Sequence, residues 1–467
     1  MSGALSGGVS GAVSRPVTRR LPMPRHWPVI HVDVAWAIAA NAVLILAMWV
    51  RHGGLDDLGT PSGLLTAIGQ LTGLYAAYAT LLELVLMSRS PWLDQLFGMD
   101  RLAWAHRWLG FSAIWLVVAH GIFTVAGYAV GDGRTLLGES WTILTTFDFV
   151  ALSVVGFGLF VAVGVTSVRA ARRRLSYERW YLIHLLAYVG IALGFLHQLA
   201  VGGDFMHDPL ARAYWIGLYV ATVALVATFR FGQPIVLNLR HRLRVARVEM
   251  EGPGVYSIYV TGHHLDRLAV RSGQWFTWRF LGGPGWWHAH PFSLSAAPNG
   301  EWLRITVKAL GDSTRALHRL PVGGRVFVEG PYGILTGARR TRRKVALIAG
   351  GIGIAPLRAL MEALPAQPGE LALIYRARAA KHVVLRDELD DLAARRGATI
   401  RYVVGRRGSA ELPGDPLGPK ALRRLLPDIA ERDVYLCGPL PMMDRLEASL
   451  AALGLPRSRI HSERFAY

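Results

Sequence analysis

The order of apolar and polar residues divides the chain into two halves. In the first half, six apolar segments follow one another, at about 32–50, 64–88, 103–130, 147–168, 179–201 and 211–230. Each is long enough to cross a hydrocarbon layer of about 30 Å as a helix, which takes roughly 20 residues. Large soluble helices are the alternative, but six such segments in succession favour a transmembrane bundle.

In the second half of the chain, the apolar segments are shorter. From about residue 237, short β-type runs are separated by Gly and Pro, which predicts a small antiparallel barrel. From about residue 343, strands alternate with helical stretches, which predicts a parallel sheet with helices on both faces. The expected parts are a disordered tail at 1–28, a transmembrane domain at 29–232, a barrel at 237–337 and an α/β domain at 340–467.

Charge separates the same two halves. Charged side chains are sparse over 1–230 and nearly twice as frequent over 231–467, so the halves are built for different solvents. The net charge of +19 raises the possibility of nucleic-acid binding, but the basic residues are scattered and only four are Lys. We therefore expect no nucleic-acid partner. The single cysteine, Cys437, excludes an internal disulfide and a cysteine-rich metal cluster.

Loop charge predicts the orientation of the bundle, because cytoplasmic loops are enriched in Arg and Lys. The tail and the second and fourth connections are basic, with Arg15, Arg19, Arg20, Arg25, Arg89, Arg101, Arg169, Arg172, Arg173, Arg174 and Arg179. The opposite connections contain three arginines and six acidic residues. Both termini and the soluble half should therefore be cytoplasmic, as in a protein of a bacterial inner membrane.

Four histidines fall within the apolar segments: His106 and His120 in the third, His184 and His197 in the fifth. An ionisable group at membrane depth indicates function by default. Their spacing along each helix corresponds to about 20 Å, so two imidazole pairs would stack across the bilayer. Neutral imidazole is a common axial ligand of haem iron, and two incomplete zinc sites are the alternative.

The spacing in the fifth segment conflicts with a regular helix. At about 100° per residue, the step from His106 to His120 returns within about 40° of one face, whereas the step from His184 to His197 misses it by about 140°. We therefore expect unwinding or a bend in the fifth helix between its histidines, where Gly190 and Gly194 could permit one.

These helices and histidine pairs resemble the transmembrane domain of the ferric reductase and NADPH oxidase superfamily, and the resemblance extends through the soluble half. It implies a bacterial NADPH oxidase-like flavocytochrome b with two b-type haems. Their axial ligands would be His106 and His184 at the inner level, and His120 and His197 at the outer level. It also implies a ferredoxin-NADP-reductase-like module that binds FAD and NADPH.

The soluble half contains motifs that look like the flavin site of that family. The run His290-Pro291-Phe292-Ser293-Leu294-Ser295 resembles its flavin-binding signature, and Gly311-Asp312-Ser313-Thr314 resembles its diphosphate-contacting turn. The resemblance implies cofactor contacts from His290, Pro291, Phe292, Ser293, Ser295, Gly311 and Thr314.

A second set of motifs indicates a dinucleotide site. A predicted strand ends in Gly350-Gly351-Ile352-Gly353, and a helix with Pro356 near its start follows, which lets backbone approach a pyrophosphate. The next strand end carries Arg376 and Arg378 in place of an acidic residue, which favours NADPH over NADH. Cys437-Gly438-Pro439 resembles the family's loop on the nicotinamide side, and structural burial is the alternative role of Cys437.

The C-terminus carries a further candidate for the flavin site. In related enzymes a C-terminal aromatic residue covers the flavin, which points to Phe465, with Tyr467 as the alternative.

The terminal electron acceptor is predicted from residues near the outer histidine pair. Arg51, near the outer end of the first helix, would stabilise superoxide in the oxidase branch, or serve as an interfacial anchor. Thr124 departs from that branch's oxygen site. We expect O2 reduction to superoxide, with ferric or cupric reduction, or electron transfer to a quinone or partner redox protein, as alternatives.

Overall fold

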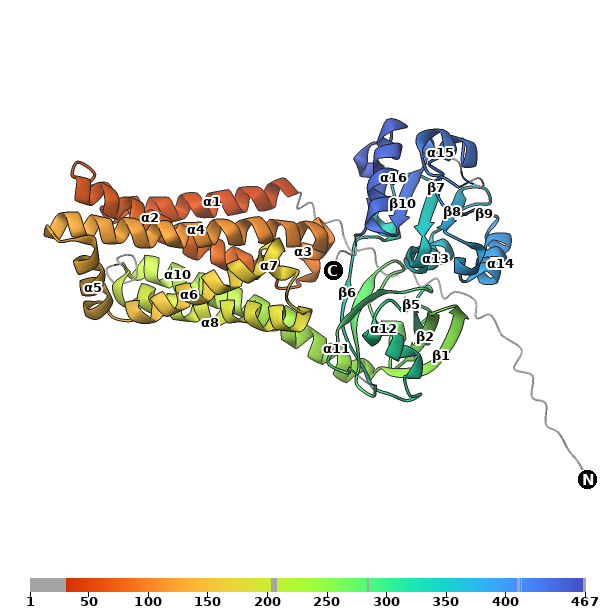
Figure 1. The fold of residues 1–467 in the computed structure, drawn as a ribbon, viewed down its shortest axis with the longest axis horizontal. Helices are drawn as coiled ribbons and strands as arrows, with labels where there is room; N and C mark the ends of the chain where they lie inside the picture. The colour runs from red at the N-terminus through yellow and green to blue at the C-terminus, as the bar shows by residue number, and fades with distance from the viewer. Residues whose placement is uncertain (1–30, 203–207, 284, 410–411, 413, 465–467) are drawn as a thin grey trace, which may run out of the picture. The chain divides into compact units, whose positions relative to one another are not determined.

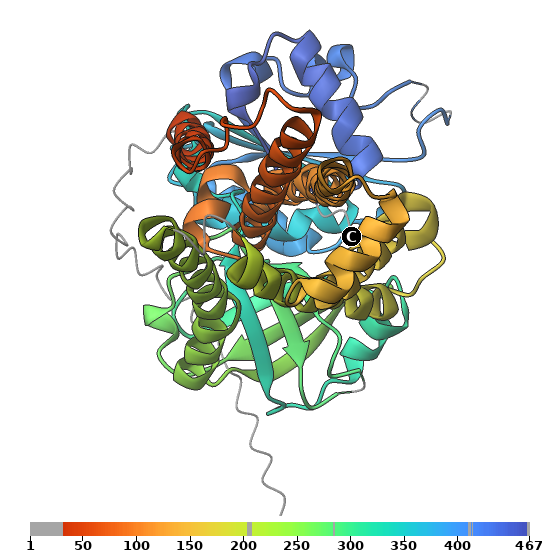
Figure 2. The same ribbon diagram turned by 90° about the vertical axis from the view of Figure 1, so that its left-hand side faces the viewer.

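The computed structural model describes residues 31–202, 208–283, 285–409, 412 and 414–464, so the predicted tail at 1–28 lies outside the described residues. These residues form two compact units, and the boundary falls between Val236 and Leu237 (Figure 1). The first unit is helical, and its long helices are seen nearly end-on in Figure 2.

Six helices are long and apolar enough to cross a membrane, in the number that the sequence predicts. They are α1 (His31–Arg51), α2 (Pro61–Leu86), α4 (Met99–Asp132), α6 (Val150–Ser167), α8 (Tyr177–Val201) and α10 (Pro209–Val226). The last continues through a π-helical turn, η1 (Ala227–Gly232), into α11 (Gln233–His241). Short helices α3 (Pro91–Phe97), α5 (Leu136–Thr146) and α7 (Arg169–Arg172) lie in the connections.

Helices α2 and α4 pack closely because glycines face the partner backbone. A Cβ atom on Gly69 of α2 would lie 2.8 Å from the amide nitrogen of Thr124. A Cβ atom on Gly127 of α4 would lie 2.8 Å from the amide nitrogen of Thr66. Both glycines begin a Gly-x-x-x-Gly motif, completed by Gly73 and Gly131, and small residues at this spacing allow membrane helices to approach closely.

The unwinding expected within α8 is absent. The helix is continuous from Tyr177 to Val201, and Gly190 faces Gly156 of α6, where a Cβ atom would lie 3.0 Å from the Gly156 carbonyl oxygen. Gly190 therefore serves close helix packing. The two α8 histidines project from the helix about 140° apart, and each can turn toward α4 from its own flank, because rotation about its χ1 and χ2 bonds redirects the imidazole.

The second unit begins with two three-stranded antiparallel sheets, ordered β1-β2-β5 and β4-β3-β6. Their strands are β1 (Arg244–Gly252), β2 (Val255–Thr261), β3 (Trp275–Phe280), β4 (His290–Ser293), β5 (Trp302–Lys308) and β6 (Val326–Tyr332). Isolated bridges join Leu294 to Ile305 and Arg244 to Arg325, and Ile258, Phe276, Trp278 and Ile305 are fully buried in the shared core. The predicted run of β-type segments therefore forms the antiparallel part of the fold.

The rest of this unit is a five-stranded parallel sheet in the order β11-β10-β7-β8-β9. The strands are β7 (Val345–Gly350), β8 (Leu371–Ala377), β9 (Thr399–Val404), β10 (Asp433–Cys437) and β11 (Ile460–Ser462). Helices α13 (Ile354–Ala363) and α14 (Arg386–Arg396) pack on one face, and α15 (Pro419–Leu425) and α16 (Leu440–Ala452) on the other. The predicted fold class is confirmed, whereas the boundary near residues 337–340 stays a prediction.

Strand β4 contains the first four residues of the predicted flavin motif. It lies at the edge of its sheet, where Pro291 pairs with Thr277 without having to donate a ladder hydrogen bond. The motif His290–Ser293 therefore has its backbone direction set by β3.

Replacing Gly127 by alanine should loosen the bundle. The added Cβ atom meets the Thr66 backbone, and overpacking of this kind costs about 1–3 kcal/mol. Thermal unfolding of the detergent-solubilised protein, followed by circular dichroism, measures the loss. Gly217→Ala in α10 is the control, because no atom lies within 4 Å of its Cβ position, and equal melting temperatures for the two variants would contradict the packing argument.

Candidate functional site

The four helix histidines form two pairs. The ring centroids of His106 and His184 lie 5.9 Å apart, and those of His120 and His197 lie 6.2 Å apart. Each pair takes one residue from α4 and one from α8, as the spacing argument predicts. The two pairs therefore occupy two levels along the bundle.

The pairs fit the axial positions of a metal held between two imidazoles. Metal–imidazole bonds are about 2.0 Å long, and a ring nitrogen lies roughly 1.1 Å from the ring centre, so two axial rings have centroids about 6 Å apart. Helix α4 packs along α2 and α8 packs along α6, while α4 and α8 make no extensive direct contact. The two residues of each pair therefore come from helices that each pack chiefly on another partner.

Helix α2 contacts both α4 histidines through the nitrogen that faces away from a ligand site. His120 Nδ1 lies 2.8 Å from the Gly69 carbonyl oxygen, which fixes it as the donor nitrogen. His106 Nδ1 pairs with the Glu83 carboxylate. In both rings Nε2 is left to bind a metal, and such outer partners orient metal-binding histidines.

The donor set does not favour zinc. In the described part of the chain, no group of three or more His, Cys, Asp or Glu side chains is placed to hold a metal ion. Two imidazoles at each level suit haem, because the porphyrin supplies the other four ligands.

Beyond the His120 level, three side chains meet near the end of α1. Asp208 Oδ2 lies 2.6 Å from His52 Nε2 and 3.9 Å from Arg51 Nη2. The Arg51 side chain is 66% exposed, so its charge is shared between solvent and Asp208. The Thr124 hydroxyl lies 3.4 Å from His120 Nδ1, and therefore near the back of the proposed ligand.

In the soluble unit, β4 presents most of the predicted flavin-binding residues. His290 stacks on Phe292 with parallel rings, and Pro291 and Phe292 are partly exposed. Burial, with the nearby charges of His288 and Arg279, lowers the pKa of His290 from 6.5 to about 4. The imidazole is therefore neutral at physiological pH, which suits an uncharged ring surface beside a flavin.

Ser295 has a different environment from the rest of the motif. Its side chain is fully buried, and its hydroxyl accepts hydrogen bonds from Arg304 Nε at 3.1 Å and from Thr306 Oγ1 at 2.8 Å. The hydroxyl therefore accepts two hydrogen bonds within the protein, and its direct contact with a cofactor stays a prediction. Ser293 remains a predicted contact.

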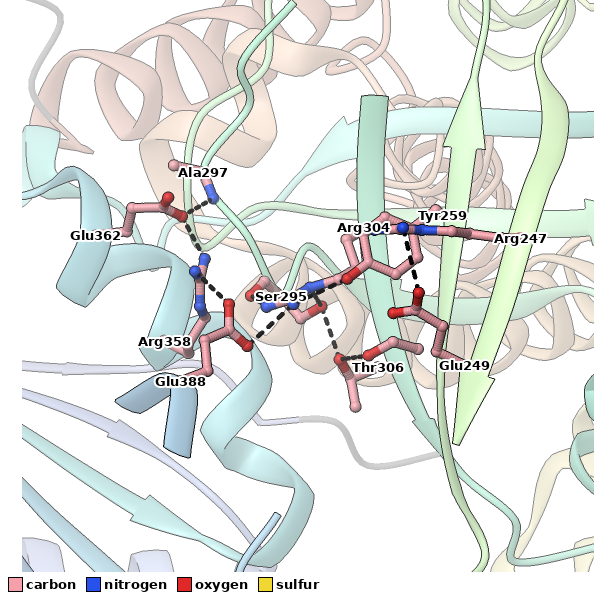
Figure 3. Close-up of polar contacts among 11 residues, drawn as sticks. Arg247, Glu249, Tyr259, Ser295, Ala297, Arg304, Thr306, Arg358, Glu362 and Glu388 are labelled. Carbon is pink, nitrogen blue, oxygen red and sulfur yellow. Dashed lines mark hydrogen bonds and ion pairs between the residues drawn. The ribbon is translucent and has the colours of Figure 1, made fainter. Parts of the chain in front are cut away.

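Arg304 also takes part in a group of ion pairs that links the barrel to the parallel-sheet domain (Figure 3). Arg304 of β5 and Arg358 of α13, each about 5% exposed, both pair with Glu388 of α14. Arg358 also pairs with Glu362, which accepts a hydrogen bond from the Ala297 amide at 2.7 Å. Glu388 is therefore a carboxylate shared between the two domains, and it was not found from the sequence because both of its partners are distant along the chain.

The predicted diphosphate turn begins the short helix α12 (Asp312–Ala316). The Thr314 hydroxyl accepts hydrogen bonds from the Leu310 and Gly311 amides, each at 3.0 Å, so it holds the turn itself. No atom lies within 4 Å of a Cβ position on Gly311, which leaves the backbone there open to a ligand.

The glycines at the ends of β7 and β10 have two roles. A Cβ atom on Gly350 or Gly438 would collide with the Met442 side chain of α16. A Cβ atom on Gly353 would collide with the Cys437 carbonyl oxygen, so these three glycines bring the two strand ends together. Gly351 has φ +55° and open space at its Cβ position, followed by the N-terminus of α13. Because β7 and β10 are adjacent and their connections run in opposite directions, this is the sheet's switch point, where dinucleotides bind. Pro439 precedes α16 at this edge, and Pro356 is buried in the first turn of α13.

The two arginines at the end of β8 are not equivalent. Arg376 donates hydrogen bonds to the carbonyl oxygens of Ala377, Val403 and Gly405, so its guanidinium ties β8 to the end of β9. Its contact with a 2′-phosphate stays a prediction, and it would require the guanidinium to exchange some of these carbonyl partners for the phosphate. Arg378 is exposed and keeps that prediction. Exposed Arg406 and Arg407, beside Gly405, are further basic residues near this strand end that sequence reasoning missed.

Cys437 ends β10 and is 3% exposed. Burial, together with the charge of Glu463, raises the pKa of its thiol from 9.0 to about 12. Its backbone oxygen lies against Gly353, so Cys437 shapes the nucleotide turn while its thiol stays protonated.

The C-terminal segment is attached to the flavin-side sheet. Glu463 is buried and accepts a hydrogen bond from Trp275 Nε1 of β3 at 2.7 Å. A Cβ atom on Gly333 would collide with the same carboxylate. Phe465 and Tyr467, the predicted flavin-covering aromatics, lie outside the described residues.

Comparison with known proteins agrees with this arrangement. Residues 72–195 match the family described as ferric reductase like transmembrane component, and residues 347–447 match the oxidoreductase NAD-binding domain family. The chain is 28% identical over 299 residues to ferric/cupric reductase transmembrane component 1 of Candida albicans, which covers 62% of this chain and 36% of that protein. It is 34% identical over 234 residues to a flavohemoprotein of Pseudomonas aeruginosa, which covers 48% of this chain and 58% of that protein.

A solved structure is similar to part of the chain. The flavohem-like FAD/NAD binding domain of nitric oxide dioxygenase from Vibrio cholerae matches with a TM-score of 0.38 and 24% identity, over 48% of this chain and 98% of that chain. The chain spans between 36% and 58% of the length of the first curated relatives that it matches.

The chain therefore combines a ferric reductase like transmembrane domain with an oxidoreductase NAD-binding domain, and ferric reductase components of Candida albicans are among its relatives, which supports the ferric reductase and NADPH oxidase superfamily. The six helices of spanning length and the ferric reductase like transmembrane match indicate an integral membrane protein.

Removing the Glu388 carboxylate should weaken the connection between the two soluble domains. Glu388→Gln leaves two buried guanidinium groups without their shared charge, and because Glu388 is 30% exposed we expect a loss of about 2 kcal/mol, less than for a fully buried pair. Bound FAD, followed by its fluorescence on heating, should be released roughly 4–8 °C earlier. Asp391→Asn, an exposed acid on the same helix, is the control; equal release temperatures would refute the role of Glu388.

The Cys437 thiol should resist alkylation in the native protein. With a pKa of about 12, only about one thiol in ten thousand is ionised at pH 8, and the side chain is buried. Iodoacetamide labelling followed by mass spectrometry should show little modification before unfolding and complete modification in denaturant. Because there is one cysteine, rapid labelling of the native chain would exclude the buried position.

Proposed function

We propose that this protein is a transmembrane oxidoreductase that passes electrons from cytoplasmic NADPH, through FAD and two b-type haems, to an acceptor on the outer face. The two histidine pairs carry the proposal, because their centroid separations of 5.9 and 6.2 Å suit axial ligation at two levels. His106 and His184 would hold the inner haem, and His120 and His197 the outer one.

FAD supplies the conversion of a two-electron hydride into single electrons, which haem carries one at a time. The protein's part is to bind and orient the groups. Gly351 and the α13 N-terminus would receive the pyrophosphate of the nucleotide, and Arg378 its 2′-phosphate. Strand β4 and Gly311 would hold FAD, with His290 and Phe292 beside its ring system.

For the acceptor we favour ferric or cupric ions. The Arg51 charge is partly compensated by Asp208, and the Asp208–His52 pair offers oxygen and nitrogen ligands of the kind that metal ions bind. One relative is named a ferric/cupric reductase component, which supports the same acceptor class. Reduction of O2 to superoxide is the second candidate, since the Arg51 guanidinium is two-thirds exposed at that end of α1 and could stabilise the anion.

The distribution of loop charge supports an orientation in which both termini and the soluble unit face the cytoplasm of a bacterial inner membrane. NADPH is then available to the soluble unit, and the acceptor is reduced outside. The basic excess of the second half fits a domain that binds anionic cofactors beside an anionic leaflet.

The purified protein, supplied with haem and FAD, tests both parts of the function. We expect two haems per chain by the pyridine haemochrome assay, and loss of one haem alone in His120→Ala or His197→Ala. An unchanged spectrum in these variants would refute the ligand assignment.

With NADPH, rapid reduction of a ferric chelate that superoxide dismutase does not slow would support the metal acceptor. Cytochrome c reduction that superoxide dismutase abolishes, with slow reduction of the ferric chelate, would support O2 in its place.

A further inference from the structure

Helix α2 runs antiparallel to α4 and contacts it at both histidine levels with the same periodicity. Gly69 and Glu83 are separated along α2 by the same interval that separates their partners His106 and His120 along α4. This interval of about four helical turns returns each partner to the same face of its helix. One helix therefore supplies the outer contact of one proposed ligand at each level.

The two contacts differ in charge. His120 Nδ1 meets a neutral backbone carbonyl, whereas His106 Nδ1 meets a carboxylate. On the α8 side, no carboxylate pairs with His184 or His197 among the residues that the structure describes. Among the described residues, the two levels therefore differ in that a carboxylate contacts the His106 ring.

Burying the Glu83 carboxylate in this helix is energetically unfavourable. Glu83 is the one charged residue of α2, and its side chain is 12% exposed within an apolar helix. Gly110 of α4 makes room for it, because a Cβ atom there would lie 3.1 Å from Glu83 Oε2. An intramembrane carboxylate is expensive to bury and marks function by default.

We propose that Glu83 is a positioning residue that, through His106, lowers the reduction potential of the inner haem relative to the outer haem. The inference rests on the proposed function, because it requires His106 and His120 to be haem ligands. A carboxylate that accepts a hydrogen bond from Nδ1 orients the imidazole and makes Nε2 a stronger donor. A stronger axial donor and a nearby negative charge both favour the ferric state.

This asymmetry gives the electron path a direction. A lower potential at the His106 level and a higher one at the His120 level make transfer from the inner to the outer site favourable. A backbone carbonyl cannot supply the same effect, because it carries no net charge. The direction is therefore built into the α2–α4 contact and does not depend on the identity of the acceptor.

Potentiometric titration of the haem-loaded full-length protein tests the proposal. The His120→Ala background retains only the haem at His106 and His184, so its single potential is assigned without ambiguity. Adding Glu83→Gln should raise this potential by at least the equivalent of a tenfold change in the reduction equilibrium, which is about 59 mV for one electron. Glu139→Gln, which removes another buried carboxylate outside the histidine levels, should leave it unchanged.

Glu83→Met, an apolar side chain of similar length, should produce the same upward shift and serves if the glutamine variant takes up no haem. An unchanged potential in a haem-loaded Glu83 variant, or an equal shift in Glu139→Gln, would overturn the role of Glu83 and leave the proposed function standing. Absence of a two-haem spectrum in the unmodified protein would instead overturn the proposed function.

Discussion

The close contact between α2 and α4 is the constraint on which the helical unit depends. Gly69 and Gly127 each face the backbone of the other helix, and any side chain there would push the helices apart. Because the helices meet this closely, the Gly69 carbonyl reaches His120 and the Glu83 carboxylate reaches His106. Helix packing and the orientation of the proposed ligands therefore have one physical cause.

In the soluble unit, the corresponding constraint is electrostatic. Arg304 and Arg358 are buried, and burying a guanidinium is tolerated only when a partner compensates its charge. Glu388 compensates both, and Arg304 in turn holds Ser295 at the end of the flavin motif. The contact that joins the domains therefore also fixes the segment that follows β4.

Local patterns were sufficient where one segment decides the outcome. The six spans follow from length and apolarity, and the parallel sheet follows from the alternation of strands and helices. Roles that depend on distant partners were not accessible in this way. The partners of Ser295 and Arg376 within the protein are examples: the hydroxyl meets Arg304 and Thr306, and the guanidinium meets three carbonyl oxygens.

The sequence by itself determined the halves of the chain, the helices that bear the histidines and the glycine turn at the switch point, because composition and periodicity act over neighbouring residues. Tertiary structure decided which side chains stand behind those histidines, that α8 stays unbroken, and that Glu388 serves two domains. The physical reason is that hydrogen bonds and ion pairs form between residues that folding brings together, and sequence separation carries little information about them.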